Sequence, residues 1–123
     1  MKIKVSAIAL TTLFISINGM AQSDYVSDMS SAYYQQWYTD YKQTGIKIND
    51  ISTIYEQQVA KRGYPKKKTV KIKMELIEHY VQLLQNQLVD PRLNKDVDTE
   101  KIQRKIDEWQ TQYVMLKALL KKI

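Results

Sequence analysis

Residues 70–88 read VKIKMELIEHYVQLLQNQL, and the spacing of their apolar side chains decides the fold class. These side chains alternate in spacing between four and three residues: Val70, Met74, Ile77, Val81, Leu84 and Leu88. Such an alternation places one apolar stripe along an α-helix, with a repeat of about 3.5 residues. Leu76, Tyr80 and Leu83 widen the stripe, so the buried face should be broad. We predict a helix over about 69–89 with more than one packing neighbour.

A second stripe of the same kind runs to the C-terminal end of the chain. Its members are again spaced by four and three residues: Ile102, Ile106, Trp109, Tyr113, Leu116, Leu120 and Ile123. Asp98 stands before the run as a helix N-cap, and Val97 and Ile102 have the spacing of a hydrophobic staple. The pattern predicts a helix over about 99–122, with the best-marked start in the chain.

Two further helices are predicted nearer the N-terminus. The segment 27–42 carries aromatic residues at helical spacing, and Gly45 is expected to end it. The segment 48–62 has apolar side chains along one face, and Gly63 follows its last turn as a second stop. No internal repeat and no low-complexity linker divides these segments, which indicates one domain.

The fold class follows from how these helices are joined. Pro91 blocks continuation of the helix before it, so a short link over about 90–97 joins the two C-terminal helices. Short links make neighbouring helices antiparallel. We therefore expect an all-α protein: a small helical bundle built on an antiparallel coiled-coil-like hairpin of the two C-terminal helices. The helices of the N-terminal half should pack against this hairpin.

Residues 1–21 have the three parts of a cleavable secretory signal peptide. Lysines near the start are followed by an apolar run over 5–17 and by small residues at Gly19 and Ala21. The alternative is a retained membrane anchor, but a spanning helix needs roughly 20 apolar residues and this run is shorter. We expect cleavage, which leaves residues 22–123 as a single helical domain in the periplasm or secreted from the cell.

Charge and cysteine content set only weak limits on function. The chain has a net charge of +6 and no cysteine, which excludes disulfides and thiol chemistry. Loss of Lys2 and Lys4 with the leader would leave the mature protein at +4, too little by itself to name an acidic partner.

The sharpest feature is a basic run that no acidic residue interrupts. Its members are Lys61, Arg62, Lys66, Lys67, Lys68, Lys71 and Lys73. The run crosses the start of the predicted helix 69–89, where the helix dipole already adds positive charge. The run has two interpretations. It is either a docking patch for anionic lipid head groups, a charged polymer or an acidic protein face, or a solvated loop whose charges are screened by salt. We do not expect nucleic acid as the partner, because Tyr64 is the only aromatic residue within the run.

Apolar and aromatic residues provide a second candidate surface. Tyr33, Trp37 and Tyr41 form a stripe expected to face the core, which would leave Tyr34 and Tyr38 on an adjacent, exposed face. Near the C-terminus the residues that fall off the apolar stripe are Val114, Met115 and Leu119. A helix that is apolar on several faces is covered either by its own fold or by a partner. The candidate protein interface is therefore Tyr34, Tyr38, Val114, Met115 and Leu119.

No arrangement of residues predicts catalysis or metal binding. His79 is the only histidine, and with Glu75 it could supply at most part of a metal site. There is no glycine-rich phosphate loop and no cysteine nucleophile, and adjacent acids such as Asp107 and Glu108 point in different directions around a helix. We expect no enzyme activity, no catalytic residue, no cofactor and no bound metal.

The sequence thus predicts an exported, non-enzymatic protein that acts through protein–protein interaction. We expect an accessory subunit of a cell-envelope assembly, such as a secretion, conjugation or surface complex, with a second copy of the chain as another partner to consider. The alternative function is charge-driven binding of an anionic envelope ligand, a lipid head group or polymer, through the run from Lys61 to Lys73.

Overall fold

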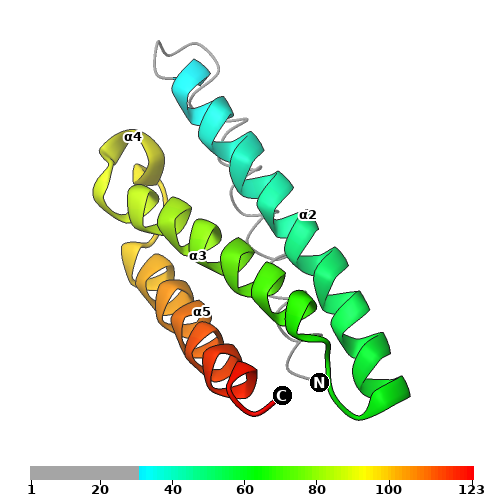
Figure 1. Cartoon of the computed structure of the whole chain (residues 1–123). Coiled ribbons are helices and arrows are strands. Elements are labelled where there is room, and N and C mark those ends of the chain that lie inside the picture. The colour runs from blue at the N-terminus through cyan, green and yellow to red at the C-terminus, as the bar shows by residue number, and fades with distance from the viewer. Residues whose placement is uncertain (1–30) are drawn as a thin grey trace.

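The computed structural model describes residues 31–123, and over this range the protein is helical and contains no strand. α2 spans Ser31–Arg62, α3 spans Lys67–Val89, α4 spans Pro91–Asn94 and α5 spans Thr99–Leu120. Figure 1 shows the three long helices side by side, with α3 between α2 and α5. The prediction of an all-α helical bundle is confirmed. The predicted leader over 1–21 lies outside the described residues.

A single long helix occupies the range where two were predicted. Gly45 does not end a helix but lies buried inside α2. A glycine inside a helix costs about 1 kcal/mol relative to alanine. Tyr41 and Ile48, on either side of it, are buried, and burying such a side chain is worth about 1.5–3 kcal/mol. The predicted break was wrong because one glycine is a weak stop where the apolar face continues beyond it.

The turn between α2 and α3 follows its predicted signal. Gly63 has a left-handed φ of +87°, and its N–H donates to the carbonyl oxygen of Val59 at 2.8 Å. α3 then begins at Lys67, two residues earlier than predicted, after an N-cap residue, Lys66, that gives no side-chain cap. The Lys66 N–H donates instead to Oε1 of Gln58 at 2.8 Å, so a side chain of α2 holds the turn.

The junction between α3 and α5 also forms as the sequence predicts. Asp90 adopts an extended conformation before Pro91, as residues before proline commonly do, and α3 ends there. Pro91 opens the one-turn helix α4, which the sequence did not predict. Asp98 caps α5 by accepting a hydrogen bond from the N–H of Glu100 at 2.9 Å, and α5 ends two residues before its predicted boundary.

Stacked aromatic rings connect the three long helices through the core. The ring of Trp37 stacks on Tyr41 with centroids 5.1 Å apart, Tyr41 stacks on Tyr80 of α3 at 4.6 Å, and Tyr80 meets Trp109 of α5 edge-on at 5.3 Å. Nε1 of Trp37 donates to the backbone oxygen of Leu83 at 3.0 Å. The broad stripe on α3 is explained by this arrangement, since α3 packs against both neighbours.

The buried face of α2 is turned by one residue from the predicted face. Trp37 and Tyr41 are buried as predicted, but Tyr33 is 38% exposed and Tyr34 only 3% exposed. Steps of four residues drift around a helix of 3.6 residues per turn by about 40° each. The alternating steps from Tyr34 to Trp37 to Tyr41 stay on one side, and this side meets α3.

Candidate interaction surfaces

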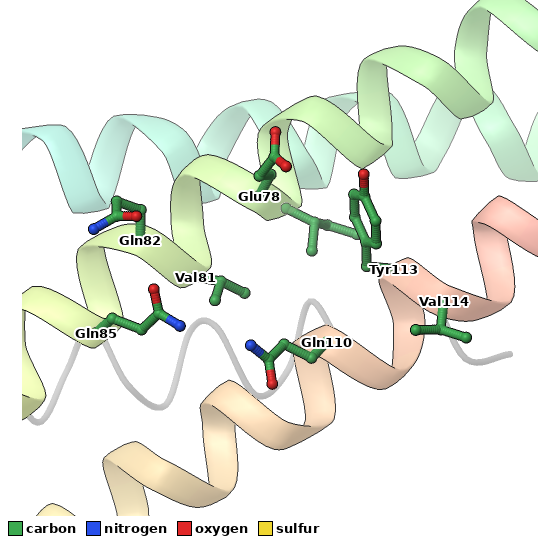
Figure 2. A pocket seen from close by; sticks show the side chains of 8 residues that line it. Glu78, Val81, Gln82, Gln85, Gln110, Tyr113 and Val114 are labelled. Carbon is green, nitrogen blue, oxygen red and sulfur yellow. The ribbon is translucent and has the colours of Figure 1, made fainter.

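An open groove runs between α3 and α5, with a volume of about 460 Å³. Its lining comes from Ile77, Glu78, Val81, Gln82 and Gln85 of α3 and from Gln110, Tyr113 and Val114 of α5. The amide groups of Gln85 and Gln110 point toward one another across it (Figure 2). Amides both donate and accept hydrogen bonds, and Glu78 is the one charged side chain in the lining. The groove can therefore take a neutral segment that is partly apolar.

A second, shallower hollow of about 380 Å³ lies along α5. Its lining consists of Asp107, Gln110, Thr111, Val114 and Met115. Val114 and Gln110 line both hollows, so Val114 forms a ridge between them. Val114 is 64% exposed and Met115 is 42% exposed, so both of these candidate interface residues are accessible to solvent.

The other three candidate interface residues are less accessible than predicted. Tyr34 is wrong as an exposed contact, because its side chain belongs to the core. Tyr38 is half-buried, its ring stacks on Tyr34 with centroids 6.2 Å apart, and burial raises the pKa of its hydroxyl. Leu119 is also half-buried and packs against the core. Sequence reasoning misjudged Tyr34 because it chose the wrong stripe for the buried face of α2.

Six members of the basic run are exposed to solvent. They are Lys61, Arg62, Lys66, Lys67, Lys68 and Lys71. The guanidinium of Arg62 lies over the ring of Tyr64, with its Cζ 4.6 Å from the ring centroid. These side chains come from the end of α2, the turn and the first turns of α3, so the run lies at one end of this helix pair.

Lys73 is wrong as a member of that exposed patch. Its side chain is 2% exposed, and its Nζ lies 4.9 Å from the centroid of the Tyr55 ring of α2. Burial lowers the pKa of Lys73 to about 8, and the nearby carboxylate of Glu56 offsets part of this effect. The reason is geometric: Val70, Lys73 and Ile77 lie on one face of α3, and that face is buried.

The fold brings further cations to the same end of the molecule. α3 and α5 have 23 and 22 residues and run antiparallel, so the end of α5 lies beside the start of α3 (Figure 1). Lys117, Lys121 and Lys122 at the end of α5 are exposed. Sequence reasoning missed these three residues, although the predicted antiparallel pairing of two helices of similar length was a sufficient signal.

Another polar contact, between His79 and Asp40, joins two helices. Nε2 of His79 lies 3.0 Å from both carboxylate oxygens of Asp40, which links α3 to α2. Within residues 31–123, no three histidine, cysteine, aspartate or glutamate side chains gather as metal ligands. None of the helices in this range is long and apolar enough to cross a membrane.

Known proteins give no further guide to these surfaces. No family model, no curated protein and no solved structure matches this chain. The groove, the ridge at Val114 and the clustered cations are the features of the described residues from which a function can be inferred.

Proposed function

We propose that the protein is an exported, non-enzymatic subunit that binds another protein of the cell envelope. It would serve as an accessory component of a secretion, conjugation or surface assembly. The observation that carries the proposal is the exposed ridge of Val114 between two hollows, since apolar side chains beside concave surface are typical of protein interfaces.

The chemistry of the groove favours a protein segment as its occupant. The exposed side chain of Val114 and the half-buried ring of Tyr113 offer apolar contact in the lining, above the buried Ile77 and Val81. Gln82, Gln85 and Gln110 supply hydrogen-bond donors and acceptors suited to the backbone of a partner. Interfaces combine an apolar centre with a polar rim in this way.

The scaffold of this surface is proposed to be the coiled-coil-like hairpin. The apolar residues of α3 and α5 repeat every 3.5 residues or so, and repeats of this kind hold two helices in one register along their length. A groove between two such helices would be largely preformed, and binding would then require little ordering of the protein.

Export is the second element of the proposal, and it rests on the leader over 1–21. The mature protein would begin at Gln22 and would act outside the cytoplasm. Intact mass measurement of the protein recovered from the envelope tests this point. A mass that corresponds to residues 22–123 supports cleavage, whereas a mass that includes Met1 to Ala21 indicates the retained anchor.

Affinity purification from envelope extracts tests the proposed surface. We compare the wild type with the double variant Val114→Asp, Met115→Asp. The matched control is Ile46→Asp, Ile54→Asp, because these two apolar residues are also exposed, at 41% and 43%, but lie on α2. A partner protein should copurify with the wild type and the control but not with the α5 variant. Equal recovery with all three proteins would show that the ridge on α5 is not the interface.

A second copy of the chain is another outcome of the same experiment. Self-association through α5 would appear as a dimer of the wild type by analytical ultracentrifugation, and the α5 variant would then be monomeric. A monomer in every case, together with a copurified protein of different mass, would assign the surface to a distinct partner.

A further inference from the structure

We propose that one end of the molecule docks on an anionic phospholipid surface. This end, here called the basic pole, consists of nine exposed cations: Lys61, Arg62, Lys66, Lys67, Lys68, Lys71, Lys117, Lys121 and Lys122. The inference goes beyond the proposed function, since the basic pole lies on residues other than those of the groove and the ridge at Val114.

The basic pole is a product of the fold. The helix pairs α2–α3 and α3–α5 lie side by side, and the α2–α3 turn and the end of α5 lie at the same end of the molecule (Figure 1). No aspartate or glutamate occurs in residues 57–74 or 109–123, the two stretches that supply the cations. Positive charge therefore accumulates at this end without a compensating acid in either stretch.

The arrangement of the cations fits an extended surface. They come from the ends of three helices that lie at one end of the molecule, so the positive charge is spread over this end and not along a single helix. A membrane that carries anionic lipids can engage such an end as a whole, and each lysine or arginine near that surface contributes to binding. A single-stranded polyanion is more often bound by a groove that tracks its backbone.

Tyr64 adds an interfacial side chain to the turn that joins the α2 and α3 cations of the basic pole. It lies in the turn after Gly63 and is 47% exposed. Tyrosine is favoured at the membrane–water boundary because its ring is apolar and its hydroxyl is polar. The guanidinium of Arg62 lies over one face of this ring, so that face is already occupied and is not open to a stacking base.

Vesicle cosedimentation tests the proposal. The protein is purified from cells, so that it carries the N-terminus that the cells give it. The probes are vesicles of phosphatidylcholine with about 30% phosphatidylglycerol, and vesicles of phosphatidylcholine alone. Each basic residue near an anionic membrane is worth about fivefold in partition coefficient. The variant Lys66→Gln, Lys67→Gln, Lys68→Gln should thus bind the anionic vesicles about 100-fold more weakly, and Lys121→Gln, Lys122→Gln about 20-fold more weakly.

A matched control removes the same charge elsewhere. The variant Lys42→Gln, Lys47→Gln, Lys101→Gln changes three exposed lysines outside the basic pole and should bind within about twofold of the wild type. Binding should also weaken steeply as salt rises from 0.1 to 0.5 M, because screening shortens the reach of the charges.

Several results would overturn the proposal. Equal binding to neutral and anionic vesicles would show that charge does not drive binding. A loss of affinity in the control variant equal to that in the Lys66, Lys67, Lys68 variant would show that binding depends on the net charge of the protein and not on the basic pole. Unchanged binding after substitution of Lys121 and Lys122 would show that α5 does not contribute to the pole. Binding to polyphosphate or heparin but not to anionic vesicles would assign the pole to a soluble polymer and reject the membrane.

Discussion

The hydroxyl of Tyr33 donates a 2.9 Å hydrogen bond to Oδ2 of Asp90, which ties the start of α2 to the junction after α3. The same carboxylate accepts from Nε and Nη2 of Arg92 at 3.1 and 2.9 Å and from the Arg92 backbone N–H at 3.0 Å. The guanidinium of Arg92 in turn lies 3.9 Å from the centroid of the Tyr33 ring. Asp90 is thus at once a helix cap, an ion-pair partner and a contact between distant segments.

Replacing Asp90 should destabilise the protein in a pH-dependent way. The hydrogen bonds from Arg92 hold the pKa of Asp90 at about 2, below its usual value of 3.8. Because the folded-state pKa is the lower one, the stabilising contribution is complete above about pH 4 and is lost as pH falls toward 2. Asp90→Asn keeps an oxygen that can cap α4 but removes the charge, so it should cost about 1–2 kcal/mol at pH 7 through the lost ion pair with Arg92. Urea unfolding at several pH values measures this difference.

Asp50→Asn provides the control for that series. Asp50 is exposed on α2, so its replacement should leave the free energy of unfolding within about 0.5 kcal/mol of wild type at each pH. If Asp90→Asn loses no more stability at pH 7 than at pH 2, the contacts of Asp90 do not contribute in the way described.

The buried charge of Lys73 should make the wild type less stable than a variant without it. Burial lowers the pKa of Lys73 from 10.5 to about 8 even with Glu56 nearby, so the net effect of its surroundings on the ammonium is unfavourable. Lys73→Met alone would leave the buried Oε2 of Glu56 without its nearby cation, so it is combined with Glu56→Gln. This double variant should raise the free energy of unfolding at pH 7 by about 1–3 kcal/mol. The gain should shrink as pH rises from 8 to 10.5, because the folded wild type then loses its proton before the unfolded chain does.

The exposed neighbour Lys71 supplies the comparison for this prediction. Lys71→Met should change stability by no more than about 0.5 kcal/mol, with no pH dependence between 7 and 10. A loss of stability in the double variant Lys73→Met, Glu56→Gln at pH 7 would mean that the ammonium is solvated or paired more favourably than its burial indicates.

Tyr41 and Tyr80 should resist ionisation until the protein unfolds. Burial raises the pKa of both hydroxyls well above the ordinary value of 10. In a spectrophotometric titration near 295 nm, these two tyrosines should ionise only together with unfolding. Since the folded-state pKa values are the higher ones, stability should fall as pH rises above about 10. Tyr80→Phe should halve the late absorbance change, whereas Tyr64→Phe should reduce only the early one.

Proline substitution distinguishes one long α2 from two shorter helices. In a continuous helix, Gly45→Pro removes a backbone hydrogen bond and clashes with the preceding turn, at a cost of about 3 kcal/mol or more. A turn at this point would tolerate proline far better. Gly63→Ala, at the left-handed end of α2, should cost about 1–2 kcal/mol. Chemical unfolding followed by circular dichroism should therefore place Gly45→Pro below Gly63→Ala in stability, and the reverse order would argue for a break in α2.

Local signals in the sequence predicted most helix boundaries. Gly63, Pro91 and Asp98 each act through their own backbone or nearest neighbours, so their effect can be read without knowing the fold. Gly45 could not be judged in this way. Whether a glycine stops a helix depends on what packs against the turns on either side, and those contacts with α3 are long-range.

The candidate surfaces were harder to predict than the helices. To predict whether Tyr33 or Tyr34 is buried, one must know which face of α2 packs against α3. An error of one residue assigns the core tyrosine to the surface and the surface tyrosine to the core. The burial of Lys73 likewise depends on which face of α3 is covered. In the sequence, Lys73 groups with its exposed neighbours because it is part of the same basic run. The cations at the end of α5 and the amide-lined groove arise only when two distant segments pair.

Photo-crosslinking in living cells tests the central claim most directly, namely that the ridge on α5 is a protein-binding surface. A photoreactive residue is placed at Val114, and in a separate strain at Ile54 of α2, and the adducts are identified by mass spectrometry. One dominant envelope protein attached at position 114 and absent at position 54 is the predicted result. Adducts of equal yield at both positions, or no protein adduct at position 114, would contradict the account.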